Sequence, residues 1–258
     1  MMTVVKVGGA VVENATSLAQ LLDAFIALPG PKVLVHGGGR MATSLAARLG
    51  LKTTMIDGRR VTDAEMLEVV TMTYGGLINK RIVAALQARD VNAIGLTGAD
   101  MNILLANRRP PRDGIDYGFV GDITATDARA LQQLLQQGYT PVIAPLTHDG
   151  QGSLLNTNAD TIATEVACAL AHDDKAVRLI FCFEHAGVLS DPNNEQSVIE
   201  RITPDSYRQL RADGIVSGGM LPKIDNAFAA LHRGVGEVII TSPDHLNAGT
   251  VFSIAEAL

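Results

Sequence analysis

The chain has 258 residues, 47% of them hydrophobic and 19% charged, a composition typical of one large globular domain or two small lobes. Its formal net charge of −6 at pH 7 includes no basic tail or run, which argues against non-specific nucleic-acid binding. No stretch of about 18 apolar residues and no cleavable leader occur, so we expect a soluble, cytoplasmic protein that binds neither nucleic acid nor a membrane. The two cysteines, Cys168 and Cys182, have no metal-type spacing and are expected to be structural thiols.

Short runs rich in Val, Ile and Leu predict the β-strands. Several of them, such as KVLVH and EVIIT, are almost entirely apolar, which is typical of parallel strands covered on both faces. Amphipathic segments alternate with these runs, so the sequence predicts an α/β fold whose ligands bind at the carboxyl ends of the strands. The predicted strands are residues 3–7, 32–36, 92–97, 140–144, 177–183 and 237–241.

Two amphipathic segments predict helices with recognisable ends. Residues 16–28 place a row of leucines and a phenylalanine on one face, with Thr16 or Ser17 as the N-cap. Residues 127–137 begin at the capping residue Asp127 and end before a glycine.

The segment VLVHGGGR, residues 33–40, has three consecutive glycines at the point where a predicted strand ends. Residues 41–49 predict a following helix, with Met41, Leu45 and Leu49 on one face. A strand, a glycine loop and a helix N-terminus let backbone N–H groups approach an anion closely. The alternative is a tight turn that needs only flexibility.

The longest helical pattern covers residues 63–89 and opens at the capping residue Asp63. The pair Gly75–Gly76 interrupts it, so we expect a kink or a close helix contact there. Its apolar character on several sides is explained either by a subunit interface or by a crossing over the sheet. Residues 101–106 and 119–123 flank a polar loop and predict a hairpin.

The first strand reads VVKVGGA and places Lys6 inside an apolar run, just before Gly8 and Gly9. A lysine in such a strand is costly unless it meets an anion or a partner, the alternative being a side chain that reaches to solvent from an edge strand. Two glycine loops after two early strands suggest a site where backbone amides hold a phosphate from both sides. The patterns GxxxxGK[ST] and GxGxxG are both absent, so this is neither a Walker A loop nor a dinucleotide fingerprint.

The stretch DGRRVTDAE contains Arg59 and Arg60 between a turn and a predicted helix. An arginine there can bind a carboxylate through two parallel hydrogen bonds. An ordinary solvated pair of arginines is the alternative.

The stretch LLNTNAD places Asn156, Asn158 and Asp160 at alternate positions, which would direct all three side chains to one side of an extended segment. Asp160 then either caps the following helix or holds cationic groups in place while an asparagine binds substrate.

The stretch IVSGGMLPKIDNAFAAL predicts a helix whose first turn holds Pro222 and Lys223. A lysine at the positive end of a helix requires a compensating negative charge, such as a nucleotide phosphate together with Asp160. The alternative is a mobile, exposed lysine.

The motifs VKVGG, HGGG, GRRVTD, NTNAD and GGMLPK, in this order, resemble the amino-acid kinase family and within it the N-acetylglutamate kinases. The resemblance runs from Lys6 to about Thr241. It implies a three-layer αβα sandwich around a mainly parallel central sheet, formed by a single domain over residues 1–258. About residues 1–170 would bind the acylglutamate and about residues 171–258 would bind ATP.

The resemblance implies transfer of the γ-phosphoryl group of ATP to the side-chain carboxylate of N-acetyl-L-glutamate, giving N-acetyl-L-glutamyl 5-phosphate for arginine biosynthesis. Mg²⁺ would accompany ATP, held by phosphates and water rather than by protein ligands. Lys6 and Lys223 would stabilise the transition state and Asp160 would orient both lysines. The further implied residues are Gly38, Gly39, Arg60 and Asn156 for substrate, Gly8 and Gly9 for phosphate, and Glu184, His185, Ala186, Gly187, Val188, Leu189, Ile215, Val216 and Ser217 for ATP.

The nucleotide strand departs from the family pattern, in which a hydroxyl residue and Asp come first and a Gly follows. Phe183 and Glu184 stand at the first two positions here, while Gly187 is kept. A catalytically silent regulator that binds an amino acid or a nucleotide is therefore an alternative, against which the presence of both lysines and Asp160 argues.

Two extra arginines, Arg40 and Arg59, stand where the family usually has small or apolar residues. They raise the alternative of an N-succinylglutamate substrate, whose acyl group carries its own carboxylate. The chain also starts directly at the first predicted strand, without the helix that builds hexamers in arginine-inhibited members. We therefore expect a homodimer without arginine feedback.

Overall fold

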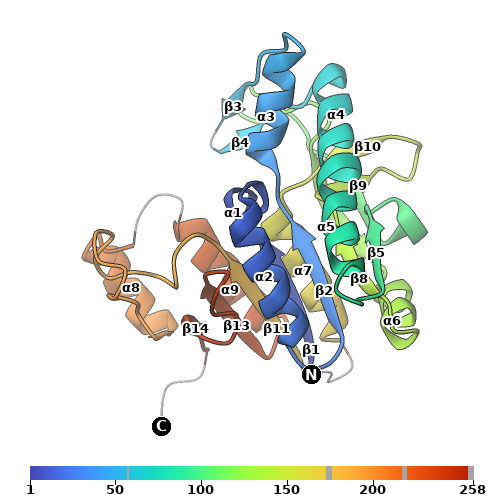
Figure 1. Ribbon diagram of the computed structural model, residues 1–258. Coiled ribbons are helices and arrows are strands. Elements are labelled where there is room, and N and C mark those ends of the chain that lie inside the picture. Colours follow the sequence, from blue (N-terminus) through green and yellow to red (C-terminus); the bar gives the residue numbers. More distant parts are fainter. Residues whose placement is uncertain (57, 173–175, 217–219, 255–258) are drawn as a thin grey trace. The chain divides into compact units, whose positions relative to one another are not determined.

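The computed structural model describes residues 1–56, 58–172, 176–216 and 220–254 (Figure 1). The chain divides into two compact units, which we call unit 1 and unit 2. Unit 1 consists of Met1–Lys32 and Ala163–Leu258, and unit 2 consists of Val33–Ile162. Among the described residues, no helix is both long and apolar enough to cross a membrane.

The sheet of unit 1 has the order β12-β14-β13-β11-β1. Strand β11 pairs in parallel with both β1 and β13, while β14 runs antiparallel to β13. Strands β1, β11 and β13 are mostly buried, as their largely apolar sequences require. The strand bounds are β1 Met2–Val7, β11 Val177–Cys182, β12 Arg201–Ile202, β13 Glu237–Thr241 and β14 Thr250–Phe252.

Helices flank this sheet. Helix α9 packs against β13, and α1 packs against α2. The helix bounds are α1 Gly9–Glu13, α2 Ala15–Ala27, α7 Ala159–Leu170, which continues from unit 2, α8 Pro204–Ala212 and α9 Leu221–His232.

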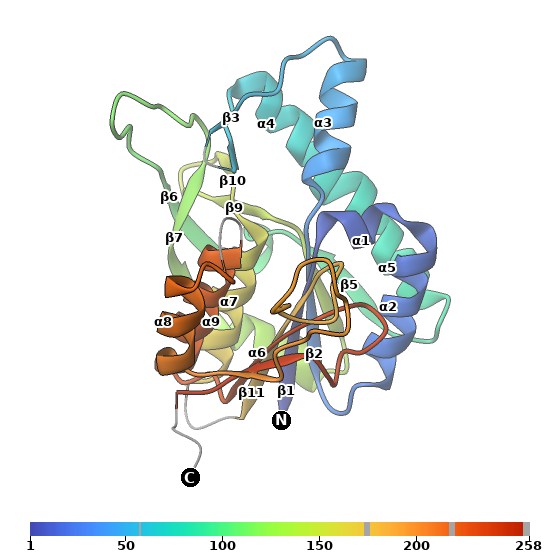
Figure 2. The same ribbon diagram turned by 90° about the vertical axis from the view of Figure 1, so that its left-hand side faces the viewer.

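Unit 2 contains a parallel group of strands in the order β2-β8-β5 and a four-stranded sheet in the order β10-β9-β6-β7. Figure 2 shows β6 and β7 as an antiparallel hairpin with a long connecting loop. Helices α5 and α6 pack against β8. The strand bounds are β2 Lys32–His36, β3 Met55–Ile56, β4 Arg59–Arg60, β5 Ala93–Leu96, β6 Leu104–Arg108, β7 Gly121–Thr126, β8 Thr140–Ile143, β9 Leu146–His148 and β10 Leu154–Asn156.

The helices of unit 2 include one long rod in three parts, visible in Figure 1 as α4 and α5 in line. The middle part, η1, is a π-helix that contains the Gly75–Gly76 pair. The predicted interruption is thus a widened helical turn, which keeps the rod continuous. The helix bounds are α3 Gly39–Arg48, α4 Ala64–Val70, η1 Thr71–Ile78, α5 Asn79–Gln87, η2 Asp100–Asn102 and α6 Ala128–Gln136.

The predicted α/β class, with a mainly parallel sheet flanked by helices, is confirmed, and so are the predicted strands and the hairpin. The predicted cap of α2 is wrong, because the side chain of Asn14 accepts the hydrogen bond from the Ser17 N–H. The helix predicted after the glycine loop, over residues 41–49, is present and begins two residues earlier, at Gly39. Helix α3 buries Ala42 and Ala46, whereas Leu49 is 54% exposed beyond its last turn.

Candidate functional site

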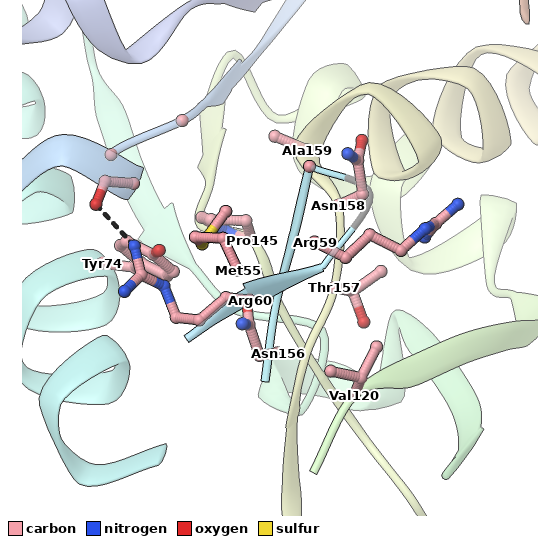
Figure 3. A pocket seen from close by; sticks show the side chains of 14 residues that line it. Met55, Arg59, Arg60, Tyr74, Val120, Pro145, Asn156, Thr157, Asn158 and Ala159 are labelled. Carbon is pink, nitrogen blue, oxygen red and sulfur yellow. Dashed lines mark hydrogen bonds between the residues drawn. The ribbon is translucent and has the colours of Figure 1, made fainter. Parts of the chain in front are cut away.

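A cavity of about 190 Å³ lies in unit 2 beside the glycine loop that follows β2 (Figure 3). Segments far apart in the sequence supply its walls, among them the loop, strand β4, helix η1 and the end of β10. The predicted residues Gly38, Gly39, Arg60 and Asn156 all line it. The structure therefore brings together every residue that the sequence assigned to substrate binding.

Gly38 and Gly39 lack side chains for different reasons. A Cβ atom at Gly38 would lie 2.3 Å from Ile78 Cδ1 and 3.1 Å from a Tyr74 ring carbon, so the close packing of η1 requires glycine there. A Cβ atom at Gly39 would meet nothing closer than Arg60 Nη2 at 3.9 Å. The fold therefore tolerates a side chain at position 39, and its absence leaves the backbone of the first turn of α3 accessible to an anion.

Arg60 is a buried cation in the wall of the cavity, only 7% exposed. Its Nη2 atom donates to the Gly39 carbonyl oxygen at 2.7 Å (Figure 3) and to Thr43 Oγ1 at 2.9 Å, and its Nη1 atom donates to Thr53 Oγ1 at 3.2 Å. These neutral acceptors fix the guanidinium without neutralising it. Its charge therefore favours an anion in the cavity.

Arg59 precedes Arg60 on the same short strand and points the opposite way, as Figure 3 shows. It is exposed, and it lines both this cavity and a neighbouring one that also contains Arg109 and Arg112. The alternative that both arginines are ordinary solvated side chains therefore holds for Arg59 and is wrong for Arg60.

Asn156 is positioned by Thr62. The Asn156 Nδ2 atom donates to Thr62 Oγ1 at 2.9 Å, and that hydroxyl donates to the Arg60 carbonyl oxygen at 3.1 Å. Because the amide nitrogen is engaged in this way, the carbonyl oxygen Oδ1 is the atom of Asn156 suited to accept from a ligand N–H group.

The predicted alternation of Asn156, Asn158 and Asp160 on one extended segment is wrong. Strand β10 ends at Asn156 and helix α7 begins at Ala159, so Asp160 lies in the first helical turn. Asn158 caps this helix, because its Oδ1 atom accepts from the Asp160 N–H at 2.8 Å and the Thr161 N–H at 3.2 Å. Asp160 is therefore not the cap, and it adds a carboxylate to the positive end of α7.

His36 holds the strand before the glycine loop in place and is fully buried. Its Nδ1–H donates to the Gly37 carbonyl oxygen at 2.9 Å, which leaves Nε2 to accept from Asn79 Nδ2 at 3.3 Å. Asn79 also donates to the Val142 carbonyl oxygen on β8 at 2.9 Å. Burial lowers the pKa of His36 to about 4, so the imidazole is neutral at pH 7.

The free energy of unfolding is expected to fall by roughly 3 kcal/mol as the pH falls from 6.5 to about 4, since the unfolded chain takes up the His36 proton over this range and the folded chain does not. Chemical denaturation of the wild-type chain and of the His36→Gln variant at several pH values measures this. The variant should lose most of that pH dependence, and an unchanged dependence would contradict the assignment to His36.

Unit 1 brings Lys6 and Lys223 to one aromatic ring. Lys6 Nζ lies 4.5 Å from the centre of the Phe183 ring, and Lys223 Nζ lies 3.5 Å from the same centre. The two Nζ atoms are therefore no more than 8.0 Å apart, the sum of these distances. Lys6 is only 6% exposed, so the alternative of a lysine reaching to solvent is wrong for it. Lys223 lies in the first turn of α9, as predicted.

Gly8 follows β1 at this site. A Cβ atom at Gly8 would make ordinary contacts at 3.5 Å with the Cys182 carbonyl oxygen and with Phe183 Cδ1, so packing does not require glycine there. Gly9 opens helix α1. Burial raises the pKa of Cys182 to about 12 against the opposing charge of Lys6, and this thiol stays neutral.

Alanine at Gly38 is expected to lower stability, whereas alanine at Gly8 is expected to lower activity and leave stability nearly unchanged. Gly38→Ala should lower the free energy of unfolding by about 1–3 kcal/mol, because it overpacks Ile78 and Tyr74. Gly8→Ala should leave stability within about 0.5 kcal/mol but reduce kcat/KM at least about 10-fold, since its methyl group blocks the approach of an anion. Denaturant unfolding and steady-state kinetics separate the two, and full activity of Gly8→Ala would contradict a phosphate contact at Gly8.

The residues predicted to contact ATP lie on two loops of unit 1. Glu184 and His185 are exposed, whereas Val188 is buried and its N–H donates to Thr250 Oγ1 at 2.8 Å. Gly187 is required by packing, because a Cβ atom there would lie 2.7 Å from Thr250 Oγ1. The remaining residues are half-buried Ala186, Leu189 and Ile215, buried Val216, and Ser217, which lies outside the described residues.

Tyr74 is a cavity residue that the sequence analysis missed. Its side chain lies beside Arg60 in Figure 3. Burial raises the pKa of Tyr74 and the charge of Arg60 partly offsets this, so the phenol remains a neutral hydrogen-bonding group. The signal was a single aromatic residue next to the Gly75–Gly76 pair in an otherwise aliphatic helix.

Comparisons with a family model and with known proteins point to the same family. The model of the amino acid kinase family matches residues 1–242. Proteins named acetylglutamate kinase from Phocaeicola vulgatus and Bacteroides thetaiotaomicron are 56% and 58% identical, the alignments covering 96% of both chains for the first and 93% of both chains for the second.

Two solved structures are also similar to this chain along most of its length. The Streptococcus mutans UA159 protein smu.665 superposes with a TM-score of 0.80 at 30% identity over 98% of this chain and 99% of that one. The N-acetylglutamate synthase of Neisseria gonorrhoeae, complexed with coenzyme A and N-acetyl-glutamate, has a TM-score of 0.82 at 25% identity over 100% of this chain and 60% of that one. Because the family model matches residues 1–242 and the acetylglutamate kinases align over more than 90% of both chains, the chain belongs to the amino acid kinase family.

Proposed function

We propose that the chain transfers the γ-phosphoryl group of ATP to the side-chain carboxylate of N-acetyl-L-glutamate, giving ADP and N-acetyl-L-glutamyl 5-phosphate for arginine biosynthesis. Relatives more than 55% identical bear the name acetylglutamate kinase. The observation that carries the mechanism is the meeting of Lys6 and Lys223, from opposite ends of the chain, around one ring beside the bare backbone of Gly8.

The acceptor is assigned to the cavity of unit 2. Arg60 would bind the α-carboxylate of the acylglutamate, because it is a buried guanidinium that has no acidic hydrogen-bond partner in the part of the chain that the structure describes. The carbonyl oxygen of Asn156 would accept from the N–H of the acyl amide. The backbone of Gly38 and Gly39 would face the carboxylate that receives the phosphoryl group.

The phosphoryl group is assigned to the two lysines. A carboxylate oxygen forms a bond to the γ-phosphorus while the bond from that phosphorus to the ADP oxygen breaks, and no proton has to move because the attacking carboxylate is already ionised. Lys6 and Lys223 would stabilise the charge on the phosphoryl oxygens, with Asp160 orienting both lysines and Gly8 and Gly9 binding phosphate. The protein's contribution is then positioning and charge stabilisation.

Two ammonium groups within 8.0 Å of each other form a donor set that fits a polyphosphate. Among residues 1–56, 58–172, 176–216 and 220–254, no three His, Cys, Asp or Glu side chains lie close enough together to hold a metal ion. Mg²⁺ would therefore be held by phosphate oxygens and water, where it would neutralise phosphate charge. ATP itself is assigned to residues 184–189 and 215–217.

The test is a coupled assay of ADP release with ATP, Mg²⁺ and N-acetyl-L-glutamate, with hydroxylamine added to trap the acyl phosphate as a hydroxamate. Both products should form in equal amounts, and neither should form with free glutamate or without an acceptor. ADP release without hydroxamate, or binding of both ligands without turnover, would contradict the proposal and favour a non-catalytic regulator.

A second candidate acceptor is N-succinyl-L-glutamate, favoured by the exposed Arg59 in the cavity wall. Its extra carboxylate would pair with the guanidinium of Arg59. A comparison of kcat/KM for the two acylglutamates in the wild-type chain and in Arg59→Ala tests this. A preference for the succinyl substrate that Arg59→Ala abolishes supports it, and a clear preference for the acetyl substrate removes it.

We further propose a homodimer in which the second copy packs on helix η1. Met72 and Leu77 of this helix are 50% and 42% exposed, so two large apolar side chains on one helix face solvent. Sedimentation equilibrium should give twice the chain mass of 27.2 kDa, and Leu77→Glu should shift the equilibrium toward the monomer. A monomeric wild-type chain would contradict the proposal.

A further inference from the structure

Phe183 lies in the phosphoryl-transfer region, and the proposed function gives its aromatic ring no role. Its ring contacts both lysines, with Lys223 Nζ 3.5 Å and Lys6 Nζ 4.5 Å from its centre. An ammonium group within about 6 Å of a ring centre is attracted by the negative face of the aromatic ring. Two cations so close together also repel each other, and an aromatic ring that attracts both offsets this repulsion.

The ring is itself held on the buried sheet of unit 1. Phe183 follows the last residue of β11, and its N–H donates to the Thr241 carbonyl oxygen at 2.8 Å. Its ring stacks on that of Phe181, two residues earlier on the same strand face, with centres 6.3 Å apart and planes 7° from parallel. Phe181 is buried and pairs with Lys6 in the register of β1 and β11, so the ring and the lysine share one rigid support.

The alternatives to an aromatic ring at this position would act differently. A carboxylate would form ion pairs with the lysines and compete with the phosphoryl oxygens, and a small hydroxyl could not reach both ammonium groups. The ring attracts both cations without accepting their strong hydrogen bonds. The ring therefore does not compete with phosphoryl oxygens for the lysine N–H groups as a carboxylate would.

We propose that Phe183 is a positioning residue for phosphoryl transfer: its ring holds the ammonium groups of Lys6 and Lys223 in place before the phosphoryl group arrives. The role rests on the proposed function. The ring would raise kcat and leave KM for the acylglutamate unchanged. The reason is that it prearranges the lysines for the transferred group, while the acylglutamate is bound elsewhere, in the cavity of unit 2.

The first test replaces Phe183 by phenylalanines that carry one, two or three ring fluorines, which weaken the negative face of the ring while nearly keeping its shape. We expect kcat to fall stepwise to a total loss of about 3- to 30-fold, with KM for N-acetylglutamate unchanged within about 2-fold. Phe183→Tyr should retain kcat within about 3-fold, and Phe183→Leu should lose at least as much as the trifluorinated chain.

The matched control is the same fluorinated series at Phe252, a buried ring that packs edge-on against Phe228 in the same unit. It should leave kcat unchanged. A flat series at Phe183, or an equal loss at both positions, would overturn the proposal.

The second test needs no turnover. The chain has six lysines, so the ε-methylene signals of ¹³C-labelled lysine can be resolved and assigned with Lys6→Arg and Lys223→Arg. Protons above a ring face are shifted upfield, so two signals should be shifted in the wild-type chain and move back in Phe183→Leu. The Lys32 signal is an internal control, because its Nζ lies 5.7 Å from the centre of a different ring, that of Phe25, and should not move.

Unshifted Lys6 and Lys223 signals would overturn the positioning role. Failure of the proposed function is distinguishable, because the wild-type chain would then form no ADP and no hydroxamate whatever the spectra show. An active wild-type chain with a flat fluorinated series would remove the role of Phe183 alone.

Discussion

Replacing either Lys6 or Lys223 by methionine is expected to lower kcat about 100- to 1,000-fold, while KM for N-acetylglutamate changes less than about 3-fold. The reason is that each ammonium group would stabilise charge that develops only as the phosphoryl group moves. Methionine fills most of the same space, so the buried position of Lys6 should not collapse. Steady-state kinetics of the single variants and of the double variant measure the effect.

The loss in the double variant should be smaller than the product of the single losses, because the two lysines act on the same group. Lys52→Met is the matched control, since Lys52 is exposed and lines neither cavity described above, and it should keep wild-type kinetics. A kcat within about 10-fold of wild type for either Lys6→Met or Lys223→Met would contradict the assigned roles.

Replacing Arg60 by alanine is expected to raise KM for N-acetylglutamate about 100-fold, with a smaller effect on kcat. The buried guanidinium would form paired hydrogen bonds with the α-carboxylate in the ground state and in the transition state alike. The variant should also lose some stability, because the Gly39 carbonyl oxygen and the hydroxyls of Thr43 and Thr53 lose their donor.

Arg60→Lys separates charge from geometry, since lysine keeps the charge and loses the planar pair of donors. It should recover only part of the affinity. Arg59→Ala is the control for N-acetylglutamate, because Arg59 points away from Arg60 (Figure 3) and should change KM less than about 3-fold. Equal effects of Arg59→Ala and Arg60→Ala on KM for N-acetylglutamate would contradict the assignment of the α-carboxylate to Arg60.

The strands were predictable because burial on both faces leaves a continuous apolar run that few other structures explain, as in residues 177–182 and 237–241. The ends of the helices were harder to predict from the sequence. Asn14 caps α2 instead of either predicted residue, and α3 runs from Gly39 to Arg48, so that Leu49 lies just beyond its end. The π-helix was not predictable, because a glycine pair inside a helical pattern suggests a kink and the sequence does not distinguish a kink from a widened helical turn.

The candidate site was predictable where a residue type destabilises the fold and so needs another reason to be present. Examples are the lysine inside an apolar strand and the three glycines that follow another strand. It was not predictable where geometry decides. Asp160 was expected on an extended segment and lies in a helix, because the chain turns at Asn158. Phe183 stood out only as a departure from a pattern, and its contacts with two lysines depend on strands that pair across most of the sequence.

The most direct test of the central claim is a crystal structure with ADP, N-acetylglutamate and aluminium fluoride, which mimics the phosphoryl group in transit. The Nζ atoms of Lys6 and Lys223 should each lie about 3 Å from a fluoride on the metal centre. Nζ atoms more than about 10 Å from that centre, beyond the reach of a screened charge, would contradict the account.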